Sequence, residues 1–366
     1  MTDKHDSREQ FAETFDQEID PLQKYEGGFR SIGADPFDLF TTEILDQKGK
    51  SNTRNNYTIP IDQWTEYMED AGRHPACPGK RHVEGFVDYQ RNELGNSKQT
   101  TKQKLIHLNR VYKFWVSEDS LPQDGSYNPF KKVLDDTEWE EDNTKTPPNL
   151  SVDDVADVLV TVKHWKHRVI ILLMLFLGIR AQEACNIELS ELNIQHDELK
   201  QQYPELGTHD RLPDGVDAIY FPTRYDREGN KSKNERIMPI PDELKVALVR
   251  YLMVRPDNGK PWLLLSHTRH NQMGNSKINE IWKDYFHPQY KYGDDEKYDS
   301  ITSHFGRHYF TTWFKKEKDW NRELVKYMRG DSIKGKDGDS LDDYVHPYFE
   351  DIRERYLEEI YKFGLR

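Results

Sequence analysis

A run of nine apolar residues, from Val169 to Leu177, limits the fold of this chain more than any other stretch. A bilayer-spanning helix needs about 20 apolar residues, so this shorter run predicts a helix buried in a protein core. Gly178 ends that helix, and Arg180 follows two residues later. The arginine is either a surface cap or a guanidinium held at the mouth of the core, oriented by Glu183.

The length and net charge of the chain limit its domain organisation and the kinds of partner it can bind. At 366 residues the chain exceeds one compact domain, so we expect two domains with extensions. A net charge of −13 argues against a uniformly basic nucleic-acid binder, so any DNA-binding surface must be local. The two cysteines lie far apart, and the charged amino terminus is no signal peptide. We therefore expect a cytoplasmic protein, without a disulfide framework and without a membrane partner.

Changes in composition divide the sequence into four segments. Residues 1–54 form an acidic N-terminal extension with no evident stable core, either a solvated tail or a protomer contact. Residues 55–137 hold short amphipathic helices separated by turn residues. Acids and a proline pair make residues 138–149 an exposed linker, and a capping-box-like start at Ser151 opens the second domain, 150–366.

One helix of the first domain carries a local excess of positive charge. It follows Gly95 and presents five cations without an acid in an otherwise acidic chain: Lys98, Lys102, Lys104, Arg110 and Lys113. A solvated helix face is the commoner meaning of such a run. The competing interpretation is a surface that follows DNA phosphates, with an affinity that falls as salt rises.

The second domain contains a predicted hairpin with a basic tip. Ala218–Phe221 and Arg236–Ile240 are strand-like and flank a polar turn that contains Lys231 and Lys233. A charged turn is the simpler interpretation of these lysines. His267, three residues before another histidine, lacks a second ligand pair, so we interpret both as surface residues and predict no metal.

His304 and Arg307 stand three residues apart, which puts an imidazole and a guanidinium on one face of a predicted helix. Arginine offers a planar fork of donors that matches phosphate, and a neutral histidine moves protons near neutral pH. Alone, the motif is short enough to arise by chance. With Arg180 and Lys231 it supplies three cations and a proton carrier, as attack on a phosphodiester needs if arginines replace magnesium.

A nucleophile is available near the C-terminus. The phenol of Tyr344 can attack phosphorus and hold DNA covalently. Tyr344, Tyr348, Ile352 and Tyr356 fall four residues apart, however, and a stripe at that spacing is more often buried packing than chemistry.

In their order along the chain, these motifs resemble the tyrosine recombinases, or phage-type integrases, over roughly residues 55–366. The resemblance rests on Leu-Gly-Ile-Arg180-x-x-Glu183, a hairpin lysine ahead of Arg236-Ile-Met-Pro, His304-x-x-Arg307 and a distal Tyr-x-His. It implies a mainly α fold with a small β-sheet: a helical core-binding (SAM-like) domain plus a catalytic domain of the DNA breaking-rejoining fold. The two would close around double-stranded DNA, with no cofactor.

The resemblance also implies roles for the site residues. Arg180 and Arg307 would hold the scissile phosphate, with Glu183 supporting Arg180. His304 would accept the proton of Tyr344, which would form a 3′-phosphotyrosyl link.

For two of these roles the sequence offers a second candidate residue. Lys231 would protonate the leaving 5′ hydroxyl, and its spacing of eight residues before Pro239 favours it over Lys233. The Tyr-x-His pattern after the loop favours Tyr344, with Tyr348 in reserve.

One position departs from the family pattern. Where the family has histidine or tryptophan, this chain has Asp331, which cannot donate a hydrogen bond to phosphate while ionised. We expect that contact to be lost, or supplied by Arg329 or His346. The loop 332–340 looks longer than usual, long enough to let the tyrosine segment move or reach a neighbouring protomer.

We therefore predict a site-specific DNA recombinase of a virus or mobile element, of an archaeal halophile type. It would act as a homo-tetramer on paired sites and exist as a monomer or dimer when free. The alternatives are a type IB topoisomerase-like relaxase and, given Asp331, a non-catalytic DNA-binding protein on a recombinase scaffold. The tail beyond Ile352 is expected to dock as a helix, onto its own chain or another subunit.

Overall fold

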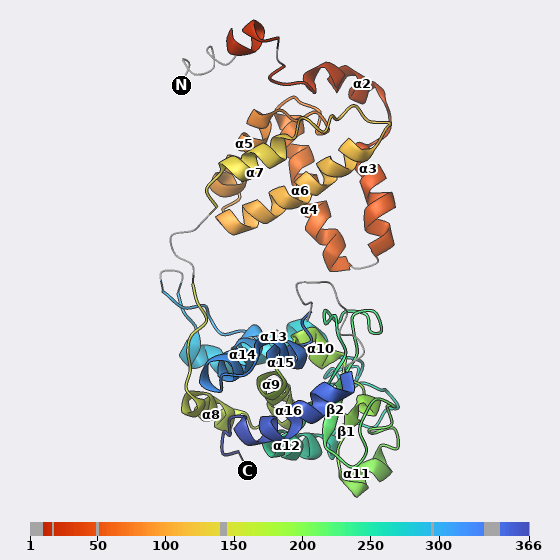
Figure 1. The fold of residues 1–366 in the computed structure, drawn as a ribbon, viewed down its shortest axis with the longest axis vertical. Coiled ribbons are helices and arrows are strands. Elements are labelled where there is room, and N and C mark those ends of the chain that lie inside the picture. The colour runs from red at the N-terminus through yellow and green to blue at the C-terminus, as the bar shows by residue number, and fades with distance from the viewer. Residues whose placement is uncertain are drawn as a thin grey trace. The chain divides into compact units, whose positions relative to one another are not determined.

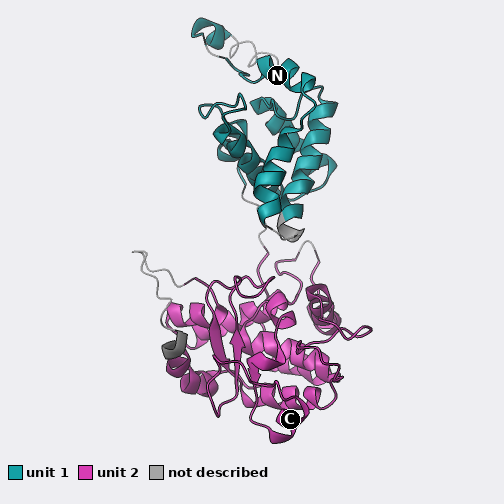
Figure 2. Cartoon of the chain, turned by 90° about the vertical axis from the view of Figure 1, so that its right-hand side faces the viewer, with its two compact units in different colours: residues 1–143 teal, residues 144–366 magenta. Residues whose placement is uncertain are grey.

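The structure is a computed structural model, and it describes residues 10–16, 18–48, 51–139, 145–293, 296–332 and 345–365. Only the backbone is described for residues 48, 51–53 and 345–348. The chain forms two compact units, residues 1–143 and 144–366 (Figure 2). Among the residues described, no helix combines the length and apolar character that a membrane crossing requires.

Unit 1 is a helical bundle. Two long helices pack against each other, and two shorter ones cover them: α4 (Ser51–Asp70), α6 (Lys98–Ser117), α5 (Lys80–Asp88) and α7 (Pro129–Asp136). Large aromatic side chains fill the space between them, including Trp64, Phe86, Tyr112 and Trp115, each 1% exposed or less. The amphipathic pattern of this region therefore predicted its helices correctly.

The N-terminal segment of unit 1 packs into the same core. It contains α2 (Glu26–Ser31) and α3 (Pro36–Phe40). Phe37 and Phe40 are buried, and the indole N–H of Trp115 in α6 donates to the carbonyl of Pro36 at 3.0 Å. The expectation of a segment without a stable core is therefore wrong for residues 22–45. Its apolar side chains follow no single period, because they belong to a succession of short helices of different types.

Unit 2 is organised around α9 (Trp165–Leu177), in which every residue from Val169 to Leu177 is buried. The helix lies between α14 (His304–Thr312) on one side and α12 (Asp242–Leu252) on the other (Figure 1). Further helices of unit 2 are α8 (Val152–Thr161), α10 (Ala181–Cys185), α11 (Asp197–Gln202), α13 (Asn275–Tyr290), α15 (Arg322–Arg329) and α16 (Val345–Glu359).

A three-stranded antiparallel sheet stands at one side of unit 2, in the order β1 (Leu192–Asn193), β2 (Ala218–Phe221), β3 (Arg236–Pro239). Ala218 pairs with Pro239 and Phe221 pairs with Arg236, which confirms the predicted hairpin. The short β1 was not predicted. Both the mainly helical character and the small sheet agree with the fold expected from the sequence.

The C-terminal tail docks on its own chain. Ile352 and Tyr356 of α16 are fully buried in the core around α9, and the hydroxyl of Tyr356 donates to the carbonyl of Phe176. Past the helix, the backbone N–H of Gly364 donates to the carboxylate of Glu243 at 2.9 Å. Of the two expected docking partners, the structure therefore has the tail bound within the same chain.

Candidate active site

Arg180 is placed by the end of α9. Gly178 caps that helix in the left-handed region, with φ of 59°, and a Cβ there would lie 2.5 Å from the ring of Phe310. Glycine suits both the positive φ and the close approach. Arg180 is the N-cap of α10, and its backbone N–H donates to the carboxylate of Glu183 at 2.9 Å. Its guanidinium emerges beside the end of α9 with 28% of the side chain exposed.

Arg307 reaches the same place from α14. Its side chain is 3% exposed, and Nη1 donates to the carbonyl oxygens of Gly178 at 2.7 Å and Arg329 at 3.0 Å. The residue before it, Gly306, allows α14 to approach α9 closely, since a Cβ there would lie 3.1 Å from the backbone of Met174. The motif thus fixes Arg307 to the end of the central helix, next to Arg180. We call Arg180 and Arg307 the arginine pair.

The carboxylate of Asp331 lies between the two members of the arginine pair. Its Oδ1 accepts from Nη2 of Arg307 at 2.8 Å and from Nη2 of Arg180 at 3.1 Å. Its Oδ2 is 2.9 Å from Nε of Arg329. Gly330, with φ of 65°, turns the chain at the end of α15 and so brings Asp331 to this position. Three guanidinium groups therefore surround one carboxylate.

The charges around the arginine pair favour the binding of an anion. Burial, followed by the charges of Arg180 and Arg329, lowers the pKa of Arg307 to about 9, and Asp331 acts in the opposite direction. Nη1 of Arg180 is buried and has no hydrogen-bond partner in the described part of the chain, because Glu183 lies 3.8 Å from it. Crowded cations with a spare donor favour an anion that carries several oxygens.

Behind the arginine pair lies a buried charged network. Glu183 and Arg236 are both fully buried, and Nη1 of Arg236 donates to the Glu183 carboxylate at 3.2 Å. The hydroxyl of Ser232 donates to the same carboxylate and accepts from Arg236 at 2.9 Å. Burial alone would raise the pKa of Glu183, but Arg236, Ser232 and Arg180 together hold it below its usual range. Glu183 is therefore held as an anion in contact with Arg180, and its supporting role in catalysis stays a prediction.

The sequence interpretation assigned no role to Arg236 or Ser232. Arg236 appears there only as the start of a predicted strand and as part of the hairpin motif, although an arginine that opens an otherwise apolar strand is a usable signal. Nothing in the local pattern distinguishes Ser232 from an ordinary turn serine.

His304 is the first residue of α14 and is exposed. Partial desolvation, followed by the charges of Arg307 and Arg180, lowers its pKa. The lowered pKa favours the neutral imidazole, which is the form that can accept a proton. Its place one helical turn from Arg307 is the one that the three-residue spacing predicted.

Lys231 lies in the loop between β2 and β3 and is exposed. It immediately precedes Ser232, whose side chain contacts the network behind the arginine pair. Lys233 is also exposed, and its backbone N–H donates to the carbonyl of Gly330 at 3.2 Å. Both lysines thus belong to a loop that contacts the site, and the choice between them stays a prediction.

The predicted nucleophile, Tyr344, lies outside the described residues. For His346 and the reserve tyrosine, Tyr348, only the backbone of α16 is described. The tyrosine stripe is buried packing where its side chains are described, since Tyr356 is fully buried.

The five predicted DNA-contacting residues of α6 do not share one environment. Arg110 and Lys113 are exposed, and Lys98 and Lys102 are partly exposed. Lys104 instead donates to Gln63 at 2.9 Å and to Gln90 at 2.6 Å. Burial lowers the pKa of Lys104, which falls on the packed side of α6.

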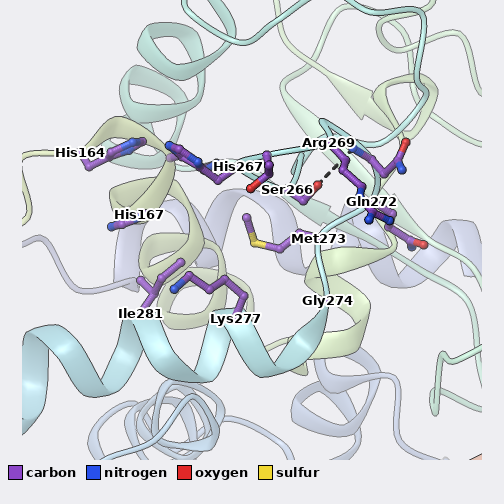
Figure 3. A pocket seen from close by; sticks show the side chains of 13 residues that line it. His164, His167, Ser266, His267, Arg269, Gln272, Met273, Gly274, Lys277 and Ile281 are labelled. Carbon is purple, nitrogen blue, oxygen red and sulfur yellow. Dashed lines mark hydrogen bonds between the residues drawn. The ribbon is translucent and has the colours of Figure 1, made fainter.

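A separate pocket of about 890 Å³ opens near the start of α9 (Figure 3). No residue of the predicted site lines it. Its walls carry three cations and three histidines but no acid: Lys166, Arg269, Lys277, His164, His167 and His267. His267 lines this pocket and is exposed, as is His270. Among the residues described, no group of three or more potential ligands is arranged to hold a metal ion.

The chain is similar to a known protein family and to known structures. The model of the phage integrase family matches residues 149–333. The integrase of transposon Tn1549, solved with transposon right-end DNA, aligns with a TM-score of 0.58 at 17% identity, over 81% of this chain and 91% of that one. A lambda integrase tetramer bound to a Holliday junction aligns with a TM-score of 0.52 at 13% identity, over 87% of this chain and 78% of that one.

At such low identities these two structures establish the fold alone. No curated protein sequence matches this chain. The family match contains Arg180, Glu183, His304 and Arg307, and also Asp331, which joins the two arginines at the end of α9. Because it extends over just more than half of the 366 residues, the chain belongs to the phage integrase family.

Proposed function

We propose that this protein is a site-specific tyrosine recombinase that cleaves and rejoins duplex DNA through a 3′-phosphotyrosyl intermediate. One observation carries the proposal: the two arginines of the pair bind a single oxygen of Asp331, at 2.8 and 3.1 Å. A carboxylate oxygen in that position stands in for a non-bridging oxygen of the scissile phosphate. Residues of the pair that already bind one oxyanion are suited to bind another of the same charge.

The proposed reaction combines the arginine pair with His304, Lys231 and Tyr344. The phenol oxygen of Tyr344 attacks phosphorus while His304 accepts its proton, and the bond from phosphorus to the 5′ oxygen breaks. Lys231 gives a proton to that leaving oxygen, so the products are a 3′-phosphotyrosyl protein and a free 5′ hydroxyl. The arginine pair stabilises the charge that develops on the non-bridging oxygens. Rejoining is the same sequence in reverse.

Asp331 has a distinct place in this scheme. It neutralises one charge of the arginine pair in the free protein and leaves Oδ1 between the two guanidinium groups. Incoming phosphate must displace that oxygen or crowd against it. We propose that Asp331 is an internal counter-ion of the free enzyme, rather than a replacement for the histidine or tryptophan of the family.

Both units contribute to the proposed DNA surface. In unit 1, residues 55–137 would act as the core-binding domain, with Lys98, Lys102, Arg110 and Lys113 near the phosphates. Lys104 is left out, since its ammonium is held by two glutamines. In unit 2, the cationic pocket of Figure 3 offers a second place for a DNA phosphate. Residues 138–149 would link the two domains.

The assembly and origin of the protein are also proposed. Lambda integrase was solved as a tetramer on a Holliday junction, and we propose the same tetramer for this chain on paired sites. The acidic composition supports an archaeal virus or mobile element from a high-salt cytoplasm, where the enzyme would be associated with the nucleoid.

Covalent trapping tests the proposal. The full chain is incubated with nicked suicide substrates carrying candidate sites, and the protein attached to DNA is mapped by mass spectrometry. We expect a covalent product with the wild type and Tyr348→Phe but none with Tyr344→Phe. Trapping that persists in Tyr344→Phe would overturn the nucleophile, and DNA binding without cleavage by the wild type would identify a non-catalytic protein. Relaxation of any supercoiled plasmid by the monomer would identify a topoisomerase-like relaxase.

A further inference from the structure

The loop that carries Lys231 is anchored on both sides of that lysine. Asn230, directly before it, is 2% exposed, and Ser232, directly after it, is fully buried. Lys231 itself is exposed. The backbone N–H of Arg224 donates to the carbonyl of Ser232 at 2.8 Å, which closes the loop across its base. An exposed lysine between two buried polar neighbours has little freedom of backbone position.

Asn230 uses its side chain to make the first anchor. Its Nδ2 donates to the carbonyl of Pro222 at 3.0 Å, at the end of β2. Its Oδ1 accepts from Nδ2 of Asn186 at 2.8 Å. A buried amide with both ends paired is expensive to disrupt, because each lost partner leaves a desolvated polar group.

Asn186 connects this anchor to the arginine pair. It is the C-cap of α10, the five-residue helix that begins directly after Arg180. Its Nδ2 also donates to the carbonyl of Glu228 in the loop at 2.9 Å. The same short helix therefore has a phosphate-binding arginine at one end and the anchor of the lysine loop at the other.

Arg227 makes a second anchor on the far side of the loop. Its Nη1 donates to the carbonyl of Asn186 at 2.7 Å and lies 2.8 Å from Glu188. Its Nη2 donates to Glu191 at 2.8 Å, a carboxylate that is 1% exposed. Bonds to carboxylates are among the stronger hydrogen bonds in proteins.

We propose that Asn230 and Arg227 are positioning residues for the general acid: they tie the loop to α10 and thereby hold Lys231 at the leaving 5′ oxygen. The inference rests on the proposed function, and it adds two residues that touch neither DNA nor the phosphate. Loss of either anchor would leave the arginine pair in place but would allow the Lys231 ammonium to move away from the leaving 5′ oxygen.

A positioning role for these residues predicts slow cleavage only when the leaving group is an oxygen that needs a proton. A 5′ oxygen must take up a proton as it leaves, whereas the sulfur of a 5′-bridging phosphorothiolate leaves as a stable thiolate. A variant that misplaces Lys231 should therefore be slow on ordinary DNA and normal on the phosphorothiolate. A variant that disturbs the fold, the arginine pair or DNA binding should be slow on both.

The experiment compares the full-length wild type, Lys231→Ala, Asn230→Ala, Arg227→Gln and the control Asn234→Ala, an alanine substitution in the same loop. Each is tested on matched suicide substrates with oxygen or sulfur at the scissile 5′ position. General acid catalysis contributes about 10²- to 10⁴-fold, so we expect anchor variants to lose about 10- to 100-fold on oxygen and less than about 3-fold on sulfur. Asn234→Ala should cleave both substrates at the wild-type rate.

The outcomes distinguish a failure of the positioning role from a failure of the proposed function. Absence of a covalent product with the wild type would overturn the proposed function itself. Failure of the sulfur substrate to rescue Lys231→Ala would exclude Lys231 as the general acid. If both behave as expected, equal loss on both substrates by a folded anchor variant overturns the positioning role, and so does an undiminished rate on oxygen. Rescue by sulfur itself shows that a variant is folded. If Asn230→Ala does not melt cooperatively, that variant is not folded, and the rates of Arg227→Gln on the two substrates test the positioning role instead.

Discussion

Replacing Asp331 by asparagine tests whether its carboxylate competes with phosphate for the arginine pair. The substitution keeps the shape and one oxygen acceptor but removes the charge. Oδ1 now accepts from Arg307 at 2.8 Å and from Arg180 at 3.1 Å, so the amide should still fit between them. If phosphate has to take over this position, we expect Asp331→Asn to bind phosphate more tightly than the wild type.

The size of the effect follows from the two shared contacts. The guanidinium donors keep their charge, so each contact loses only the charge of its acceptor and weakens by roughly 1 kcal/mol. Asp331 is 27% exposed, and solvent screening reduces the sum of about 2 kcal/mol to about 1–2 kcal/mol. At about 1.4 kcal/mol per factor of ten, phosphate affinity should rise by about 5- to 30-fold.

Thermal stabilisation by inorganic phosphate measures this affinity, since a ligand that binds only the folded state raises the melting temperature with its concentration. The titration is run at constant ionic strength with the wild type, Asp331→Asn and the control Asp197→Asn, an exposed charge in α11. Asp197→Asn should match the wild type. Equal or weaker phosphate binding by Asp331→Asn would refute competition and would mean that the carboxylate holds the arginines in their binding positions.

Four further outcomes are expected. Glu183→Gln leaves the buried charge of Arg236 without a counter-ion, so urea unfolding of unit 2 should show a loss of about 3–5 kcal/mol, and a loss below about 1 kcal/mol would contradict the network. Gly306→Ala forces α14 away from α9 and should cost about 1–3 kcal/mol, whereas Gly274→Ala, whose Cβ would meet only the Ser276 hydroxyl at 3.9 Å, should not. The pKa of His304 is lowered, so covalent trapping should fall only as the pH drops through a midpoint below about 6.5, and a midpoint above that value would exclude His304 as the acceptor. Lys277→Ala should reduce the salt dependence of DNA binding by about one unit of slope if the pocket holds a phosphate, and an unchanged slope would exclude that role.

The parts of the site that the sequence predicted are those set by local periodicity. The spacing of His304 and Arg307 is a helical one, and Gly178 marks the end of an apolar run, so the elements around them could be located without a structure. The hairpin of β2 and β3 was readable for the same reason, as strand-like residues flank a polar turn.

What the sequence could not show depends on contacts between distant segments. Asp331 looked like a lost donor, because its meaning depends on Arg180, which lies 151 residues earlier. The pairing of Glu183 with Arg236 and the anchoring of Asn230 to Asn186 join separate elements in the same way. No pattern within one element encodes such pairs.

The burial of α9 has a consequence for how activity is lost on heating. Its residues 169–177 are shielded on all sides, so their amide hydrogens should exchange with solvent only when unit 2 opens as a whole. Arg180 and Arg307 are both attached to the end of that helix, whereas Lys231 is an exposed residue of a loop that side-chain hydrogen bonds hold at Asn186. Hydrogen exchange should therefore find the phosphate-binding end of the site in the slowest-opening part of unit 2 and the acid in a faster one. On heating, the capacity to protonate the leaving group should be lost before the capacity to bind phosphate.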